Sequence, residues 1–555
     1  MKKLKNGLFL LGILLLAWGC YDDKGSYDYH NINEVAIDLP ASVGTRLLKN
    51  DSVLLELDPK LTQTQANDET NLTFKWEIKE PQGGWKLCGD EKACRIWLQP
   101  EDVSAFTVRL TLTDNSSDGT VWYKMVNVTP IPPYNRCWFV LQEVNGQSVL
   151  GAVDGMGEHA VVIPDVYETD MGKKLSLQGT PKALINNIKY GDAWGGYYSP
   201  AKPVVILMTD RDAVVLNSST FAVEYTLEDM LYGKKLAGDT DFAPEFIYSK
   251  TQSAGEMIID RGELYHATAD GYSVYYPTVL TQGNKTDFRA KIACASDEYF
   301  VIYDELHHRF LGFDGGLSSS LADYDQYLRL SGSPNYYVSG YTFKLELIPE
   351  KEESVNLFDP NNIGDDKVML DMGITAQRSD AYGKIVSILY SRTDHMLHVY
   401  EINADAVRDP KTPWCSGKFK VPLPAGVDYR DLCFTTSYLY DRLFFMAAEN
   451  KIYKVDLNRV VPETSVIYEH SDPAVKIKRL KFRLNYYAHY VWNEDWLSYI
   501  AEGLPYLLGA ALDYGGDQGG LVEMKLNASG DVLRGENSLE FKGFGKIVDI
   551  GSNIK

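Results

Sequence analysis

The chain has 555 residues and a formal net charge of −21, with 45% hydrophobic and 12% aromatic residues. This length exceeds one ordinary domain, so we expect at least two domains, and the apolar content is sufficient for packed cores. An acidic surface repels phosphate backbones, and no basic stripe interrupts it, which excludes a nucleic-acid partner.

The first twenty residues carry the pattern of an export signal. Three lysines precede the apolar run "GLFLLGILLLAWG" at residues 7–19. A basic head before an apolar run is typical of a signal peptide, and the run is shorter than the roughly 20 residues that span a bilayer. Cys20 directly follows a small residue, as in a bacterial lipobox. We therefore predict a signal peptide at residues 1–19 and lipidation of Cys20, with an ordinary signal before a chance cysteine as the alternative.

The segment after Cys20 is polar. Residues 20–32 include Asp22 and Asp23 and show no apolar period, which predicts a flexible tether between the lipid and the first domain.

Short alternating strands follow at residues 33–130. Apolar residues recur with period two in four segments: "VLLELDP" (53–59), "LTFKWEIKE" (72–80), "FTVRLTLTD" (106–114) and "VWYKMVNVTP" (121–130). About a hundred residues of such strands, with Trp76 in a middle strand, predict an immunoglobulin-like β-sandwich.

Two of the cysteines are close neighbours. Cys88 and Cys94 bracket a polar loop, and a disulfide there would suit an oxidising location, although two unpaired thiols fit the spacing equally well. Four others lie in apolar strand-like segments and are predicted to be small core residues: Cys137, Cys294, Cys415 and Cys433.

A proline-rich break at residues 129–135 separates the sandwich from a longer β-rich region, residues 134–555. Seven hairpin-like copies recur there, at residues 137–155, 203–225, 255–277, 291–314, 384–404, 436–457 and 506–527. Hairpins that recur without amphipathic helices predict a β-propeller of seven blades. Residues 541–551 would add a strand to the first blade and close the ring. A large open or two-layer β domain is the alternative.

The order of these segments resembles that of the PKD-like family lipoproteins of Bacteroidota. The resemblance lies mainly in "CYDDKGSYDY" at residues 20–29 and extends over the sandwich. It implies lipid anchoring in the outer membrane, facing the cell exterior, beside a SusC/SusD-type TonB-dependent transporter. It supplies no catalytic motif that transfers to this chain.

Catalytic and cofactor motifs are not found in the sequence. There is no His-Glu-x-x-His, Cys-x-x-Cys, Gly-x-Ser-x-Gly or phosphate-loop pattern, so we assign no catalytic residue, no metal ligand and no cofactor. Two acidic turns, at residues 359–367 and 513–520, leave calcium binding open because they offer oxygen ligands.

Aromatic residues cluster instead in glycine- and proline-containing loops. Flat rings with a polar tip suit recognition of sugars or extended peptides, and half-buried strand positions are the alternative. The predicted ligand-binding residues are Trp194, Tyr197, Tyr198, Tyr275, Tyr276, Tyr336 and Tyr337.

The sequence therefore favours a non-catalytic, surface-exposed binding lipoprotein that serves a nutrient importer and takes a peptide or an oligosaccharide. Two other classes stay open. One is a propeller hydrolase or lyase with dispersed carboxylates, which converging carboxylates in the central channel would favour. The other is a structural brace of the transporter, which an apolar patch on an outer face would favour.

Overall fold

A computed structural model describes residues 33–554 with several gaps. The gaps are residues 50, 66–67, 117–118, 156, 158–159, 192–198, 232–240, 251–254, 268–274, 281–285, 297–298, 315–326, 330–336, 340–342, 376–382, 408, 484–489, 492–499, 502–506 and 534–537. The chain divides into two compact units between Ile131 and Pro132, and these units are called unit 1 and unit 2. Within the described ranges, no helix is long and apolar enough to cross a membrane.

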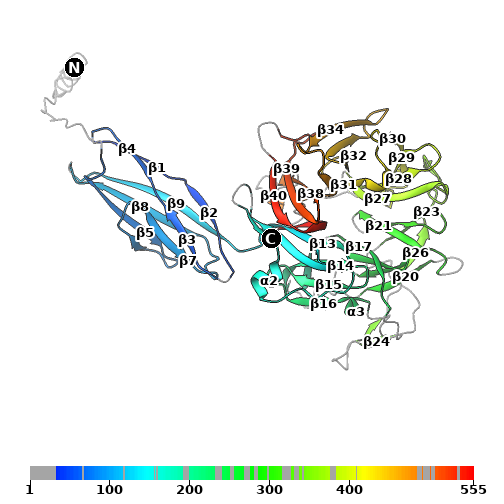
Figure 1. Ribbon diagram of the computed structural model, residues 1–555, viewed down its shortest axis with the longest axis horizontal. Coiled ribbons are helices and arrows are strands. Elements are labelled where there is room, and N and C mark those ends of the chain that lie inside the picture. The colour runs from blue at the N-terminus through cyan, green and yellow to red at the C-terminus, as the bar shows by residue number, and fades with distance from the viewer. Residues whose placement is uncertain are drawn as a thin grey trace, which may run out of the picture. The chain divides into compact units, whose positions relative to one another are not determined.

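Unit 1 is a β-sandwich (Figure 1). Its five-stranded sheet consists, in spatial order, of β2 (Ser42–Arg46), β9 (Val121–Ile131), β8 (Phe106–Asp114), β5 (Leu72–Lys79) and β6 (Trp85–Gly89). Two strand pairs complete the unit: β1 (Val35–Asp38) with β4 (Lys60–Gln63), and β3 (Val53–Leu57) with β7 (Cys94–Leu98). The four predicted alternating segments are β3, β5, β8 and β9, so the predicted sandwich is confirmed.

The core of unit 1 follows from the period-two pattern. Alternate residues of β5 and β8 face inward and are buried, and Trp76 lies at their centre with 0% exposure. The Trp76 indole Nε1 donates to the carbonyl oxygen of Glu91 at 3.0 Å, so its one polar atom is satisfied. A buried tryptophan with a satisfied N–H is the anchor expected of such a sandwich.

Unit 2 is built from antiparallel sheets of four strands. Five separate sheets have the spatial orders β12–β11–β10–β41, β13–β14–β15–β16, β27–β28–β29–β30, β31–β32–β33–β34 and β35–β38–β39–β40. A further sheet of eight strands runs β17–β18–β19–β20–β26–β23–β22–β21, and its two halves are joined by the parallel pair β20–β26.

The strand bounds in the first half of unit 2 are β10 Arg136–Val144, β11 Gln147–Asp154, β12 Val161–Ile163, β13 Pro181–Gly191, β14 Ser199–Thr209, β15 Ala213–Asn217, β16 Val223–Thr226, β17 Pro244–Lys250, β18 Gly255–Asp260, β19 Glu263–Ala267, β20 Tyr276–Leu280, β21 Ala290–Ser296, β22 Tyr299–Asp304, β23 Arg309–Asp314, β24 Tyr327–Arg329, β25 Tyr337–Ser339 and β26 Phe343–Leu347. Strands β24 and β25 form a separate antiparallel pair.

The remaining strands are β27 Lys367–Thr375, β28 Lys384–Ser391, β29 Met396–Asn403, β30 Cys415–Pro422, β31 Cys433–Thr436, β32 Leu443–Ala448, β33 Lys451–Asp456, β34 Glu463–Glu469, β35 Lys476–Phe482, β36 Tyr490–Val491, β37 Ile500–Ala501, β38 Leu507–Gly515, β39 Gln518–Lys525, β40 Leu539–Phe544 and β41 Lys546–Ile554. The described helices are short: α2 Val166–Met171, α3 Leu227–Met230, η3 Ala404–Val407 and η4 Tyr429–Asp431.

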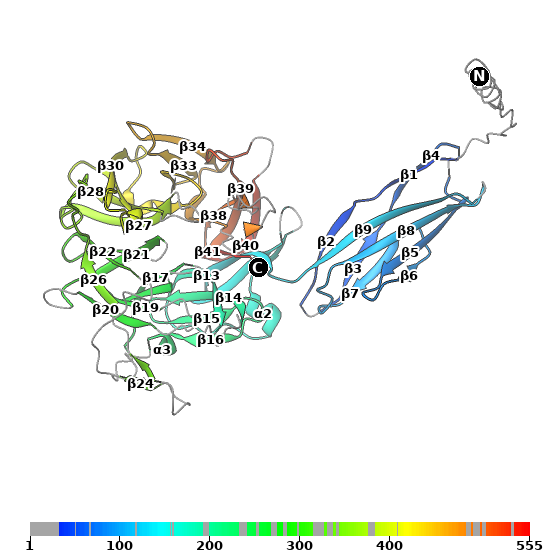
Figure 2. The same ribbon diagram turned by 180° about the vertical axis from the view of Figure 1, so that it is seen from behind.

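The sheets of unit 2 follow one another around a common centre (Figures 1 and 2). Edge strands lie innermost, one from each four-stranded sheet and both from the eight-stranded sheet. Contacts between these innermost strands run through β41, β13, β17, β21, β27, β31 and β35 and back to β41. The all-β architecture of a sandwich followed by a propeller-like domain is therefore confirmed. The number of blades stays a prediction, because the third and fourth groups of strands share one sheet beside undescribed residues.

The C-terminal strand completes the sheet that begins unit 2. Strand β41 pairs antiparallel with β10, from Arg136 opposite Ile554 to Glu143 opposite Lys546. The prediction that the C-terminal segment adds a strand to the first blade is confirmed. On β10, the Trp138 ring lies so close to Gly509 of β38 that a Cβ at position 509 would be 2.5 Å from it, and Trp138 Nε1 donates to Glu523 Oε2 at 2.6 Å.

Tight hairpins connect the middle strands of these sheets. Strands β10 and β11 are joined by Asn145-Gly146, and β18 and β19 by Arg261-Gly262, with positive φ at all four residues. Two-residue hairpin loops favour this left-handed geometry because its twist matches that of the flanking strands.

Most innermost strands share a one-residue β-bulge near their beginning. In β35, for example, Ile477 lies opposite Leu512 and Arg479 lies opposite Ala511, so Lys478 has no partner across the ladder. The corresponding extra residues are Lys182 in β13, Glu245 in β17, Lys291 in β21, Leu370 in β27, Lys478 in β35 and Val548 in β41. Bulges bend a strand and re-aim its side chains, which matters for the site below.

Candidate functional site

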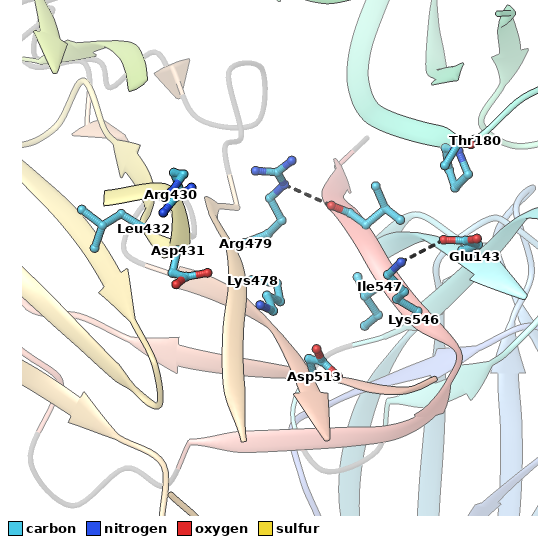
Figure 3. Close-up of a pocket in the computed structure, with 12 residues that line it drawn as sticks. Glu143, Thr180, Arg430, Asp431, Leu432, Lys478, Arg479, Asp513, Lys546 and Ile547 are labelled. Atoms are coloured by element: carbon cyan, nitrogen blue, oxygen red, sulfur yellow. Dashed lines mark hydrogen bonds and ion pairs between the residues drawn. The ribbon is translucent and has the colours of Figure 1, made fainter. Parts of the chain in front are cut away.

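A cavity of about 330 Å³ opens in unit 2 where several innermost strands begin (Figure 3). Its lining residues are Glu143 at the end of β10, Thr180 and Pro181 at the start of β13, Arg430, Asp431 and Leu432 in and after η4, Lys478 and Arg479 in β35, Asp513 near the end of β38, and Lys546, Ile547 and Val548 in β41. The site thus combines segments that are hundreds of residues apart in the chain.

The bulge in β35 explains why two adjacent cations line one cavity. Successive side chains of a regular strand point to opposite faces, so Lys478 and Arg479 would normally diverge. Lys478 is the unpaired extra residue, and the local kink lets both side chains reach the same space (Figure 3).

Several charges around the cavity are already paired. Lys546 Nζ lies 3.1 Å from Glu143 Oε2 across the β10–β41 pair. The Arg430 guanidinium forms two hydrogen bonds to the Asp428 carboxylate, which lies outside the lining. Arg479 Nε donates to the carbonyl oxygen of Val548 at 3.0 Å, which fixes the guanidinium against β41.

A second polar group lies further along the same strands. The Asp549 Oδ2 atom of β41 accepts from Lys481 Nζ of β35 at 2.7 Å and from the Leu184 amide of β13 at 2.8 Å. Lys481 also donates to the Leu184 carbonyl at 2.8 Å. One carboxylate therefore links three consecutive innermost strands beside the cavity.

Asp371 of β27 is an unusual acid of the same region. Burial raises the pKa of its carboxyl to about 7, against the opposing effects of the Met372 amide and of the positive charges of Arg479 and Lys481. The Met372 amide donates to Asp371 Oδ1 at 2.8 Å. The carboxyl group therefore exchanges its proton near neutral pH.

In the described part of the chain, no three side chains among His, Cys, Asp and Glu are grouped to hold a metal ion. The two histidines of the "DHMLH" segment have separate partners: His395 Nδ1 lies 2.7 Å from Tyr390 Oη, and His398 Nε2 lies 2.9 Å from Asp394 Oδ2. Calcium binding at the acidic turns stays a prediction.

Most of the predicted aromatic site cannot be placed. Trp194, Tyr197, Tyr198 and Tyr336 lie outside the described residues, as does Cys20, and so these assignments stay predictions. Tyr276 and Tyr337 lie in β20 and β25, and only their backbones are described.

Tyr275 requires a correction. Its side chain is 2% exposed and its hydroxyl donates to Glu256 Oε2 at 2.5 Å, so it is a core residue of unit 2 and offers no open face to a ligand. The proline and glycine context suggested a surface loop, but the ring turns inward because a buried carboxylate satisfies its hydroxyl.

The Cys88 and Cys94 thiols lie close together. Their Sγ atoms are 3.7 Å apart, within hydrogen-bond distance, and no disulfide joins them in this structure. The other four cysteines of the described chain, Cys137, Cys294, Cys415 and Cys433, are buried, which confirms their assignment to the core.

The cavity residues themselves were missed by the sequence analysis. Lys478, Arg479 and Lys546 lie in short, polar strand segments without a motif, and Asp513 was considered only as a calcium ligand. The available signal was that "KIKRLKF" is a strand with too many cations for an ordinary buried sheet.

Comparison with known families supports the assignment of the N-terminal part of the chain. Residues 20–181 match the model of the PKD-like family, so the match covers unit 1 from Cys20 onward and reaches the start of β13. No curated protein matches the chain.

Solved structures similar to this chain include propellers. The β-propeller domain of Myceliophteria thermophila Cps50 (Swd1) shares 10% identity, with 66% of this chain and 88% of that chain covered and a TM-score of 0.34. The Dos1 propeller shares 11% identity, with coverages of 74% and 88% and a TM-score of 0.31. Dihydro-heme d1 dehydrogenase NirN shares 12% identity, covers 75% of each chain and has a TM-score of 0.34. Likeness at these scores carries no argument about function.

Proposed function

We propose that this protein is a non-catalytic ligand-binding lipoprotein of the outer membrane, anchored through Cys20 and facing the cell exterior. It works with a SusC/SusD-type TonB-dependent transporter and captures a peptide or an oligosaccharide for import. The observation that carries the proposal is the cavity of unit 2, which is lined by Lys478 and Arg479 of the innermost strand β35 together with Asp431 of η4 and Asp513 of β38. Concave sites with a few convergent polar groups are typical of ligand-binding proteins.

The anchoring part of the proposal is supported by the basic and apolar N-terminus that ends at Cys20. The match to the PKD-like family model begins at this same residue. A lipid on Cys20 would supply the membrane affinity, while residues 20–32 provide the reach between the membrane and unit 1.

Co-purification from the native host tests the association. The full-length protein with a C-terminal tag is isolated from detergent-solubilised outer membrane, and the accompanying chains are identified by mass spectrometry. We expect a TonB-dependent transporter and its SusD-like lipoprotein, and recovery of the protein alone would contradict the partnership.

The Cys20→Ala variant tests the anchor in the same cells. We expect loss of acyl labelling and loss from the outer-membrane fraction, whereas labelling that persists would remove the lipoprotein assignment. Replacement of Asp22 and Asp23 by Ala should keep the lipid but reduce protease shaving of intact cells if these acids direct surface display.

A hydrolase or lyase is the second candidate, and the carboxylates of Asp431 and Asp513 in one cavity favour it. Paired carboxylates support glycoside cleavage only at defined separations. Turnover of a glycan or peptide by the purified protein that is abolished by both Asp431→Asn and Asp513→Asn would establish this candidate over the binding protein.

A structural brace is the third candidate, favoured by the outer face of the five-stranded sheet in unit 1. Leu87, Tyr123 and Met125 are 58%, 61% and 54% exposed there. Exposed apolar side chains gathered on one face are typical of a protein contact. The brace would be favoured if the transporter complex stays intact in a variant that no longer binds ligand but dissociates when Tyr123→Ser and Met125→Ser are combined.

A further inference from the structure

We propose that the unit 2 cavity binds a short zwitterionic ligand, such as a peptide with free ends. Lys478 and Arg479 would receive its carboxylate, and Asp431 and Asp513 would receive its ammonium group. This inference rests on the proposed function, because it names the class of ligand that the binding protein takes.

Some of the charges that line the cavity are already neutralised by other side chains of the protein. Four basic and three acidic side chains line the cavity. Lys546 is paired with Glu143 at 3.1 Å, and Arg430 is paired with Asp428, which does not line the cavity. These two cations and Glu143 are therefore poorly available to a ligand.

Two cations and two anions remain. Within the described residues, neither Lys478 nor Arg479 has a carboxylate within ion-pair distance, and Arg479 uses only its Nε, for the Val548 carbonyl. Its terminal nitrogens stay available in a fixed orientation. Asp513 accepts one amide hydrogen bond, from Gly515 at 2.8 Å, and no cation of the described chain pairs with Asp513 or Asp431.

This balance of charges selects among ligand classes. A carboxylate on an arginine or lysine, and an ammonium on an aspartate, form charge-assisted hydrogen bonds that are about twice as strong as neutral ones. A neutral sugar leaves both the cations and the aspartates unpaired. A polyanion is repelled by the two aspartates, and a polyamine is repelled by the two cations. Only a ligand with both charges satisfies all four side chains.

The size of the cavity limits the ligand further. Its 330 Å³ lies at the lower end of the about 300–1,000 Å³ typical of small-molecule sites. A peptide of two or three residues, or the terminal part of a longer one, fits this space better than an extended chain.

Isothermal titration calorimetry of the full chain with four probes tests the inference. The probes are trialanine, its C-terminal amide, its N-acetyl derivative and the neutral trisaccharide maltotriose. We expect trialanine to bind and each end-blocked derivative to bind about 10- to 100-fold more weakly, since hydrogen bonds to charged groups contribute about 1.5–3 kcal/mol.

Variants assign each end of the ligand. Arg479→Gln should weaken trialanine binding as much as the amide does and should leave the affinity for the amide unchanged. Asp513→Asn should correspond in the same way to N-acetylation. Lys542→Gln is the matched control, because Lys542 is an exposed lysine of β40 outside the cavity, 67% accessible.

The outcomes separate the inference from the proposed function. Binding of maltotriose that Arg479→Gln weakens, with no trialanine binding, overturns the zwitterionic class but keeps a binding protein. No binding of any probe, or equal weakening by Lys542→Gln, overturns the assignment of this cavity to such ligands. The partnership with the transporter is judged independently by co-purification.

Discussion

Lys481 of β35 and Asp549 of β41 form a 2.7 Å hydrogen-bonded ion pair, and the Asp549 oxygen that accepts it also accepts the Leu184 amide of β13. The Asp549 side chain is 6% exposed. Removal of one partner from a buried pair leaves an uncompensated charge and an unpaired amide, so the cost exceeds that of a surface ion pair.

We therefore expect Asp549→Ala to lower the free energy of unfolding by about 3–5 kcal/mol. The measurement is a urea or thermal unfolding series of the full chain. Lys451→Ala is the control, since Lys451 pairs with Glu469 on the surface and its loss should cost about 1 kcal/mol or less. Equal effects of the two variants would mean that Asp549 does not link the strands.

The raised pKa of Asp371 predicts an unusual dependence of stability on pH. A pKa of about 7 means that the folded protein keeps a proton that the unfolded chain releases near pH 4. This residue therefore makes the protein less stable as pH rises from about 4 to about 7. Asp371→Asn should remove that loss and raise the free energy of unfolding at pH 8 by about 1–3 kcal/mol. The gain is smaller than the gain expected for a fully buried carboxyl, because Asp371 keeps some access to solvent.

Parallel melts of Asp371→Asn and the unaltered protein at pH 5 and pH 8 check this expectation. The gain should be present at pH 8 and small at pH 5. A gain of equal size at both values would indicate an effect of packing instead of titration.

Cys88 and Cys94 should form a disulfide under oxidising conditions. Their Sγ atoms need to approach from 3.7 Å to about 2.05 Å, and a hydrogen bond with Cys94 lowers the pKa of the Cys88 thiol, which favours the reactive thiolate. Exchange with oxidised glutathione would form the Cys88–Cys94 bond and break the glutathione disulfide, and the two molecules of reduced glutathione that result take up the two electrons and two protons of the thiols.

Alkylation followed by mass spectrometry checks the disulfide. The native reduced protein should take up label at Cys88, and oxidation should abolish that uptake and lower the mass by two hydrogens. Cys88→Ser should show no such change. Continued labelling after oxidation would indicate that the strands hold the thiols apart.

Deletion of residues 546–555 should unfold unit 2. The truncation removes β41, uncovers the edge of β10 and opens the contacts of β35 and β13 with their neighbour. We expect loss of the cooperative unit 2 transition in calorimetry, while the transition of unit 1 persists. A chain that lacks only Lys555 is the control, and retention of both transitions after the longer deletion would show that β41 is dispensable.

Much of the fold could be predicted from the sequence because burial leaves a clear pattern. All seven predicted hairpin segments contain paired strands, since the middle strands of each sheet are buried on both faces, as "LFFMAA" of β32 illustrates. The sandwich of unit 1 could be predicted for a similar reason, because β5 and β8 each have one apolar face.

The candidate site could not be predicted because its residues form no motif and do not follow the apolar pattern of the buried strands. Innermost strands face the centre of unit 2 and carry charged side chains, such as Lys478, Lys481 and Asp549, that interrupt the apolar pattern. Their meeting depends on β41 returning to β10 from the far end of the chain, a relationship that no local spacing records. Tyr275 shows the opposite error, because a turn-like sequence context hid a buried side chain.

The β-bulges near the starts of most innermost strands provide residues that can contact a ligand without taking part in the pairing of the strands. An extra residue has no partner across the ladder, so its identity does not set the register of the sheet. Lys182, Glu245, Lys291 and Lys478 therefore occupy positions where one amino acid can replace another without shifting the strands. Lys478 is the one of these four residues that lines the cavity, so a substitution there can change ligand preference while the scaffold remains the same.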